Sequence, residues 1–190
     1  MRPPVLLLPG WQNSGPEHWQ SHWERLHGYQ RVEQHDWMHP RRGDWIARLE
    51  EVMLSCPSPA VLAAHSLGCV QVAAWAAHSR YPHLVRAAFL VAPGDAERED
   101  VREQLPGWAP VPMQALPFPS MLLSSRDDPF CTQERAHAMG RAWGSTLVDC
   151  GACGHINSAS GLGDWPEGHR QLLVLQSIPH TDSAQTLMRH

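Results

Sequence analysis

The segment Ala64-His65-Ser66-Leu67-Gly68 decides which fold this sequence predicts. It follows the apolar run 59–63, which is typical of a buried strand, and precedes the Ala-rich run 69–78, which favours a helix. A serine between small residues, where a strand turns sharply into a helix, is the pattern of a nucleophile elbow. The turn crowds the neighbouring strand, so the residues two before and two after the serine must be small. Gly68 satisfies this requirement, whereas Ala64 replaces the usual glycine with the next smallest residue.

Predicted strands and helices alternate on both sides of this segment. Strands are predicted over the mostly apolar runs 4–8, 59–63, 84–92, 120–124 and 146–148, and a short strand over 30–34. Apolar residues at helical spacing predict helices over residues 17–27 and 44–55, the latter with Asp44 as the cap. Further helices are predicted over 69–78, which is Ala-rich and free of Gly and Pro, and over 132–143 and 166–176. Apolar strands that alternate with helices favour an α/β fold, a three-layer αβα sandwich with a mostly parallel sheet. We expect one domain over residues 1–178 and a polar tail over 179–190.

Composition excludes several classes of protein. The 15 Lys and Arg residues are scattered among 19 Asp and Glu, so no nucleic-acid-binding face is expected. No stretch approaches the roughly 18 apolar residues that cross a membrane, and the run 5–8 is shorter than a signal-peptide core. Five cysteines without the spacing of a disulfide framework favour free thiols and a cytoplasmic location.

The loops that follow the predicted strands hold the candidate catalytic residues. In parallel α/β sheets, ligand-binding and catalytic residues lie in the loops at the carboxyl ends of the strands. Ser66, Asp127 and His155 each follow a different predicted strand, in the chain order of a Ser-Asp-His hydrolase triad. We therefore predict Ser66 as the nucleophile, His155 as its base and Asp127 as the acid that orients the imidazole, with Asp128 as the alternative acid.

The loop Pro9-Gly10-Trp11 after the first strand fits an oxyanion hole. The backbone N–H groups of Trp11 and Leu67 are the predicted donors to the oxyanion. A phosphate-binding role is disfavoured, because neither G-x-G-x-x-G nor a Walker lysine is present. Trp37 and Trp108 fall in predicted loops, where we expect them to line a substrate pocket. The segment 93–119 is too short for a separate lid domain, which predicts an open, shallow site served by one mobile loop.

A set of short motifs along residues 5–175 carries a family resemblance. These motifs are Leu8-Pro9-Gly10-Trp11, Pro16-Glu17-His18-Trp19, Gln34-His35-Asp36-Trp37, His65-Ser66-Leu67-Gly68, Leu116-Pro117-Phe118-Pro119-Ser120, Ser125-Arg126-Asp127-Asp128-Pro129, Gly154-His155-Ile156-Asn157 and Trp165-Pro166-Glu167. On these motifs the chain resembles the retinoblastoma-binding-protein/YdeN family of small serine hydrolases, within the α/β-hydrolase superfamily.

The resemblance implies a reduced α/β-hydrolase sheet of about six parallel strands and a carboxylesterase-like or aminoacyl-arylamide-cleaving activity. It also implies that the acid is the first aspartate of Asp-Asp-Pro, which is Asp127. The sequence departs from the family's pattern at Ala64, and from the superfamily's at Cys131, where proline often follows the acid. Neither change removes a catalytic atom, but both can alter the turn geometry and therefore the rate.

The remaining cysteine, histidine and tryptophan residues of interest are assigned structural rather than catalytic roles. Cys150-x-x-Cys153 near His155 lacks the further ligands of a zinc site and the context of a thioredoxin, so no metal or cofactor is expected. The pairs His18/His22 and His35/His39 are interpreted as solvated helix faces. Five tryptophans are assigned to packing between helices and sheet: Trp19, Trp23, Trp45, Trp75 and Trp143.

Together these features predict a serine hydrolase (EC 3) that acts on a small-molecule ester, thioester or amide. The expected substrate carries a small acyl or aminoacyl group. The alternative from another class is a binding or scaffold protein on a hydrolase fold with weakened catalysis, and Ala64 is the feature that keeps this alternative open. Protein partners are left open.

Overall fold

Six parallel strands form one sheet, in the order β2-β1-β3-β4-β5-β6, in the computed structural model, which describes residues 3–179. The strands are β1 (Val5–Leu8), β2 (Gln30–Arg31), β3 (Ala60–His65), β4 (Val85–Val91), β5 (Ser120–Ser124) and β6 (Thr146–Asp149). The helices are α1 (Trp19–His27), α2 (Arg42–Leu54), α3 (Leu67–Ala76), α4 (Glu99–Arg102), α5 (Gln133–Trp143) and α6 (Pro166–Ser177), with short 3₁₀ turns at Pro82–Leu84 and Ser158–Ser160. The predicted α/β class is confirmed.

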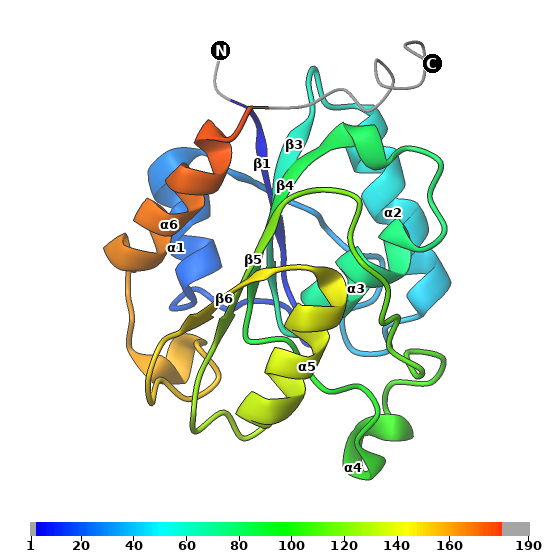
Figure 1. The fold of residues 1–190 in the computed structure, drawn as a ribbon, viewed down its shortest axis with the longest axis vertical. Helices are drawn as coiled ribbons and strands as arrows, with labels where there is room; N and C mark the ends of the chain where they lie inside the picture. Colours follow the sequence, from blue (N-terminus) through cyan, green and yellow to red (C-terminus); the bar gives the residue numbers. More distant parts are fainter. Residues whose placement is uncertain (1–2, 180–190) are drawn as a thin grey trace.

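Helices cover both faces of the sheet, as Figure 1 shows. Successive strand residues point to opposite faces, so Leu6 and Leu8 of β1 pack in one core cluster and Val5 and Leu7 in the other. The first cluster is completed by α2, α3 and α5, and the second by α1 and α6. The three-layer αβα arrangement is therefore confirmed.

The five tryptophans assigned to packing are buried in these two clusters. Trp45, Trp75 and Trp143 lie in the first cluster, and Trp19 and Trp23 lie in the second. Each is at most 1% exposed, which confirms the packing prediction. Burial of side chains this large is the dominant favourable term for the fold.

Several elements begin or end at residues other than those predicted. The prediction that Asp44 caps the second helix is wrong, because α2 begins at Arg42 with Arg41 as its N-cap. Asp44 instead lies in the first turn, where its negative charge still favours the helix dipole. Only Gln30 and Arg31 of the predicted strand 30–34 form β2. The next residue, Val32, still donates its N–H to the Leu7 carbonyl, and beyond it the chain leaves the edge of the sheet.

Two further predictions concern the C-terminal tail and segments that could cross a membrane. The predicted tail 179–190 lies, apart from Pro179, outside the described residues, so the division into domain and tail stays a prediction. Among the helices of residues 3–179, none has the length and apolar character needed to cross a membrane.

Candidate active site

Ser66 occupies a strained turn between β3 and α3. Its φ of 54° and ψ of −121° lie in a region that residues with a Cβ rarely adopt. The turn is held in place because the Ser66 backbone N–H donates to the Val91 carbonyl at the end of β4. Ala64 is fully buried in β3 between its partners Leu8 and Leu90, so its methyl group fits where the pattern has glycine.

Three glycines leave the space that this turn needs. A Cβ on Gly68 would lie 2.3 Å from the Leu8 carbonyl oxygen, and one on Gly10 would lie 2.8 Å from the Ser66 Cβ. A Cβ on Gly94 would lie 3.1 Å from the Ser66 Oγ. The small-residue requirement inferred from the sequence therefore has a direct steric cause.

Gly68→Ala is expected to lower the midpoint of thermal unfolding by about 3 to 10 °C, because the added methyl group meets backbone that cannot rotate away. Circular dichroism on heating measures this change. Gly43→Ala in α2 is the matched control, since a Cβ there meets nothing within 4 Å and alanine favours a helix. An unchanged midpoint for Gly68→Ala would contradict the steric explanation.

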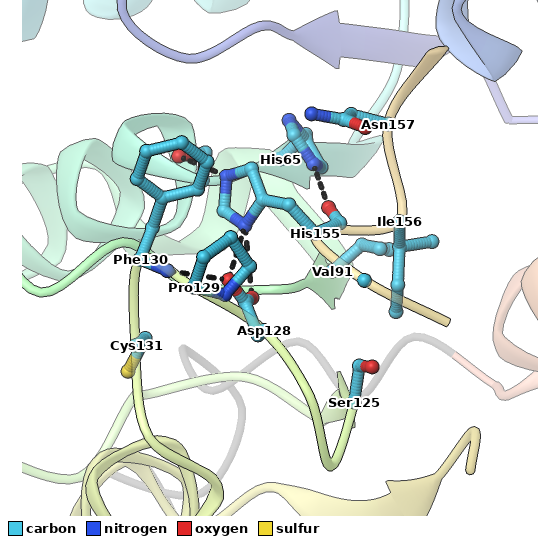
Figure 2. A network of polar contacts seen from close by, with 12 residues as sticks. His65, Val91, Ser125, Asp128, Pro129, Phe130, Cys131, His155, Ile156 and Asn157 are labelled. Atoms are coloured by element: carbon cyan, nitrogen blue, oxygen red, sulfur yellow. Dashed lines mark hydrogen bonds and ion pairs between the residues drawn. The ribbon is translucent and has the colours of Figure 1, made fainter. Parts of the chain in front are cut away.

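Ser66, His155 and Asp128 form a continuous hydrogen-bonded row. The Ser66 Oγ lies 2.9 Å from His155 Nε2, and Asp128 Oδ2 lies 2.8 Å from His155 Nδ1. The three residues follow β3, β6 and β5, whose carboxyl ends meet at one edge of the sheet. A carboxylate can only accept, so Nδ1 carries the proton and the bare Nε2 accepts from the serine hydroxyl. Figure 2 shows the imidazole beside the Asp128 carboxylate.

Asp127, the acid that the sequence predicted, does not contact His155. Its Oδ1 accepts from the Ser125 hydroxyl at 2.8 Å and from the Gly154 N–H at 2.8 Å. These two bonds hold the pKa of the Asp127 carboxyl below its usual range. The carboxylate that contacts the imidazole is therefore that of Asp128, the alternative acid in the sequence analysis, and its side chain is only 3% exposed.

Local hydrogen bonds explain why the second aspartate turns inward. The Asp128 Oδ1 accepts from the Phe130 N–H at 2.8 Å, which is the Asx-type bond of a tight turn. The first aspartate is meanwhile tied to the loop before His155 through Gly154. The sequence contains no signal that separates two adjacent aspartates, because the direction of each depends on turns formed between distant segments.

Two rings pack against His155, and the sequence analysis did not assign them a role. His65 Nε2 donates to the His155 carbonyl at 2.8 Å, as Figure 2 shows. Burial lowers the pKa of His65 well below its usual value, so this ring is neutral and fixes the loop without adding charge. On the other side, the Phe130 ring centroid lies 4.7 Å from that of His155. Together they hold the imidazole in place.

Trp11 and Leu67, predicted as oxyanion donors, both lie at the pocket beside Ser66. Within residues 3–179, neither backbone N–H makes a hydrogen bond to another protein group. Gly10 brings the first loop against the elbow, since a Cβ there would lie 3.2 Å from the Leu67 nitrogen. Two unpaired N–H groups are thus available near the Ser66 hydroxyl.

The pocket over Ser66 has a volume of about 330 Å³ and two chemically distinct kinds of lining. Apolar side chains come from the segment 93–119 and from the loop after β5, including Val101, Leu105 and Phe130. Polar side chains come from the loop after β1 and the loop that carries His155, including Gln12, Asn13, His18 and Asn157. The sequence analysis assigned none of these side chains to the pocket.

Trp37 and Trp108, predicted to line the pocket, are not among its lining residues. Trp108 is fully buried, and its indole N–H donates to the Pro40 carbonyl at 2.9 Å. Trp37 packs edge-to-face on Trp45 of α2, with ring centroids 5.4 Å apart. Both predictions are wrong because these loops fold over α2, where Trp108 is buried in the core and Trp37 is partly buried against it.

The sequence analysis also singled out a cysteine pair and two histidine pairs. Cys150 and Cys153 are free thiols, and burial raises the pKa of Cys150 to about 11. Among the described residues, no group of three or more His, Cys, Asp or Glu side chains is arranged to hold a metal ion. The prediction of a solvated face at His18 is wrong, since this residue is only 4% exposed and lines the pocket.

A parallel sheet with a serine elbow and a histidine loop at its carboxyl edge defines the class of α/β-type serine hydrolases. The chain belongs to the serine hydrolase family, whose model matches residues 5–174, and it is YdeN-like within that family. The enzyme class inferred from the sequence is therefore confirmed.

Solved structures place the chain near YdeN-like hydrolases. A protein described as a YdeN-like hydrolase from Pectobacterium atrosepticum is 30% identical, with 94% of each chain covered and a TM-score of 0.81. The ydeN gene product from Bacillus subtilis is 19% identical, with 93% of this chain and 100% of that chain covered and a TM-score of 0.73. The esterase RhEst1 from Rhodococcus sp. is 15% identical, with 94% and 92% covered and a TM-score of 0.65. Among curated proteins, none matches the chain significantly.

Proposed function

We propose that the protein is a carboxylesterase-like hydrolase that cleaves small esters through Ser66, His155 and Asp128. The observation that carries this proposal is the unbroken row in which His155 lies 2.9 Å from the Ser66 Oγ and 2.8 Å from Asp128. This geometry supplies the base that a serine hydroxyl needs, and the carboxylate that an imidazolium needs.

Acylation begins when the Ser66 Oγ attacks the ester carbonyl carbon and its proton passes to His155 Nε2. The Asp128 carboxylate stabilises the imidazolium that forms. The N–H groups of Trp11 and Leu67 bind the oxyanion, each contributing about 3 to 4 kcal/mol in comparable sites. As the tetrahedral intermediate collapses, His155 gives its proton to the departing alkoxide. The alcohol leaves and the acyl group stays on Ser66.

Deacylation repeats these steps with water. His155 accepts a proton from a water molecule while the water oxygen attacks the acyl carbonyl carbon. Collapse of the second tetrahedral intermediate breaks the bond to the Ser66 Oγ, which takes the proton back. The carboxylic acid is released and the free enzyme is restored.

The size of the pocket supports small substrates. A volume of about 330 Å³ lies at the low end of small-molecule sites and accommodates a short acyl or aminoacyl group with its leaving group. Thioesters and aminoacyl arylamides follow the same chemistry and are included in the proposal as substrates to be tested. No cofactor is needed for these steps. The free thiols fit a reducing cytoplasm, which we propose as the location.

The expected result of treating the native protein with a fluorophosphonate is one covalent adduct on Ser66, because its hydroxyl lies 2.9 Å from His155 Nε2 and lines the pocket. Ser124 also lies near a histidine, at 3.0 Å from His137 Nε2, but it is only 1% exposed and does not line the pocket. Peptide mass spectrometry locates the adduct. Protein unfolded in urea before treatment is the control and should remain unlabelled. An adduct on any other serine would contradict the proposal. Labelling at Ser66 without turnover of an ester and arylamide panel would favour the alternative of a binding or scaffold protein.

A further inference from the structure

His18 lines the pocket over Ser66, and its ring carries a buried nitrogen without a hydrogen-bond partner among the described residues. The residue lines the pocket over Ser66 and is 4% exposed. Its ring packs against His65, with centroids 4.6 Å apart, and His65 in turn packs against His155 at 4.8 Å. Within the described residues, the Nε2 of His18 is buried without a hydrogen-bond partner. A buried polar atom without a partner is costly, so a substrate that supplies the missing partner gains binding free energy. Of the five such side-chain atoms among the described residues, only that of His18 belongs to a residue that lines the pocket.

The hydrogen bond made by the other ring nitrogen of His18 determines which of the two nitrogens carries the proton. His18 is the N-cap of α1, where its Nδ1 accepts from the Gln20 N–H at 3.2 Å. Nδ1 therefore has no proton, and a neutral ring must carry its proton on Nε2. Burial, followed by the nearby Arg31 charge, lowers the pKa of His18 to about 3, which keeps the ring neutral. The unpaired Nε2 is thus a hydrogen-bond donor.

We propose that the His18 Nε2–H donates to an uncharged oxygen of the substrate that lies outside the scissile bond. This inference rests on the proposed function and specifies its substrate class: esters that carry a hydroxyl, ether or carbonyl oxygen close to the reacting carbonyl. A site built around a buried donor discriminates strongly against an analogue that cannot accept.

The surroundings of His18 favour an uncharged acceptor over a carboxylate. His65 beside it is neutral, because burial lowers its pKa. The nearby Arg31 guanidinium is paired with Glu24 at 2.8 Å and also donates to Asn13 and Ser21. A carboxylate in the pocket would lose its hydration without gaining a free cation in return. An ether or hydroxyl oxygen needs only the one donor.

Three esters of equal size test this inference: butyl butyrate, butyl methoxyacetate and 2-methoxyethyl butyrate. Each ether replaces one methylene of the reference ester by oxygen, in the acyl group or in the alcohol, and so separates the two places where the acceptor can lie. Rates are measured by pH-stat and divided by those of hydroxide-catalysed hydrolysis. We expect the enzyme to prefer one ether over butyl butyrate, and His18→Asn to reduce that preference about fivefold to tenfold.

Asparagine at position 18 keeps the helix cap but is too short to place a donor at the Nε2 position. His18→Ser, which also caps a helix, is the second variant if the first fails to fold. The matched control is His22→Asn on the same helix, which should leave the preference within about twofold, since His22 does not line the pocket. No preference in the native enzyme, or an equal loss on all three esters, would overturn the inference. Hydrolysis of butyl butyrate that survives Ser66→Ala would instead overturn the proposed function.

Discussion

Ser66→Ala is expected to lower kcat/KM for a short-chain ester by about 10⁵-fold to 10⁶-fold, the loss seen when a triad serine is removed. The variant lacks the oxygen that lies 2.9 Å from His155 Nε2, so no acyl-enzyme can form. The fold should be unaffected, because alanine meets the same backbone strain at φ 54° as serine does. The residual rate would come from binding and from the Trp11 and Leu67 N–H groups.

Initial rates with butyl butyrate and a burst measurement at high enzyme concentration check this expectation. Ser55→Ala is the control, because it removes an exposed hydroxyl at the end of α2, away from the pocket. Thermal unfolding should show the same midpoint for both variants and the native protein. A Ser66→Ala enzyme that retains one tenth of the activity would remove this residue as the nucleophile.

The sheet, Ser66 and His155 were predictable because the sequence patterns that indicate them lie within short segments of the chain. The small residues around Ser66 reflect steric limits within a few residues of the elbow, such as the space beside Gly68. The strand before His155 ends in a Gly-rich loop, which places the imidazole at the carboxyl edge. The alternation of apolar strands with helices likewise predicted the layers, because a parallel sheet of apolar strands must be covered by helices on both faces.

Residues whose positions depend on contacts between distant segments were not predictable. His18 has the spacing of an exposed helical pair with His22, yet it is buried because β3 brings His65 against it. Trp108 lies in an irregular loop, yet its indole reaches the Pro40 carbonyl across 68 residues of sequence. No local pattern encodes these contacts. The choice between adjacent aspartates depends in the same way on Gly154, which binds one of them from another loop.

Asp128→Asn is expected to lower kcat about 10⁴-fold, as the same change does in other serine triads. The Asp128 carboxylate accepts from His155 Nδ1 at 2.8 Å and so holds the proton on that nitrogen. An asparagine that turns its amide group toward Nδ1 would favour the opposite tautomer, in which Nε2 carries the proton and cannot accept from Ser66. Steady-state kinetics on a short-chain ester measure the loss, and the fluorophosphonate labelling rate should fall with it.

Asp127→Asn is the matched control, and it separates the two adjacent acids. Asparagine keeps the Oδ1 that accepts from Ser125 and Gly154, so the loop before His155 stays in place. The charge is lost only at a position whose carboxylate does not contact the imidazole, and we expect kcat to fall less than about tenfold. If Asp127→Asn showed the large loss and Asp128→Asn the small one, the acid implied by the family resemblance would be correct. The hydrogen bonds around His155 would then differ in the working enzyme.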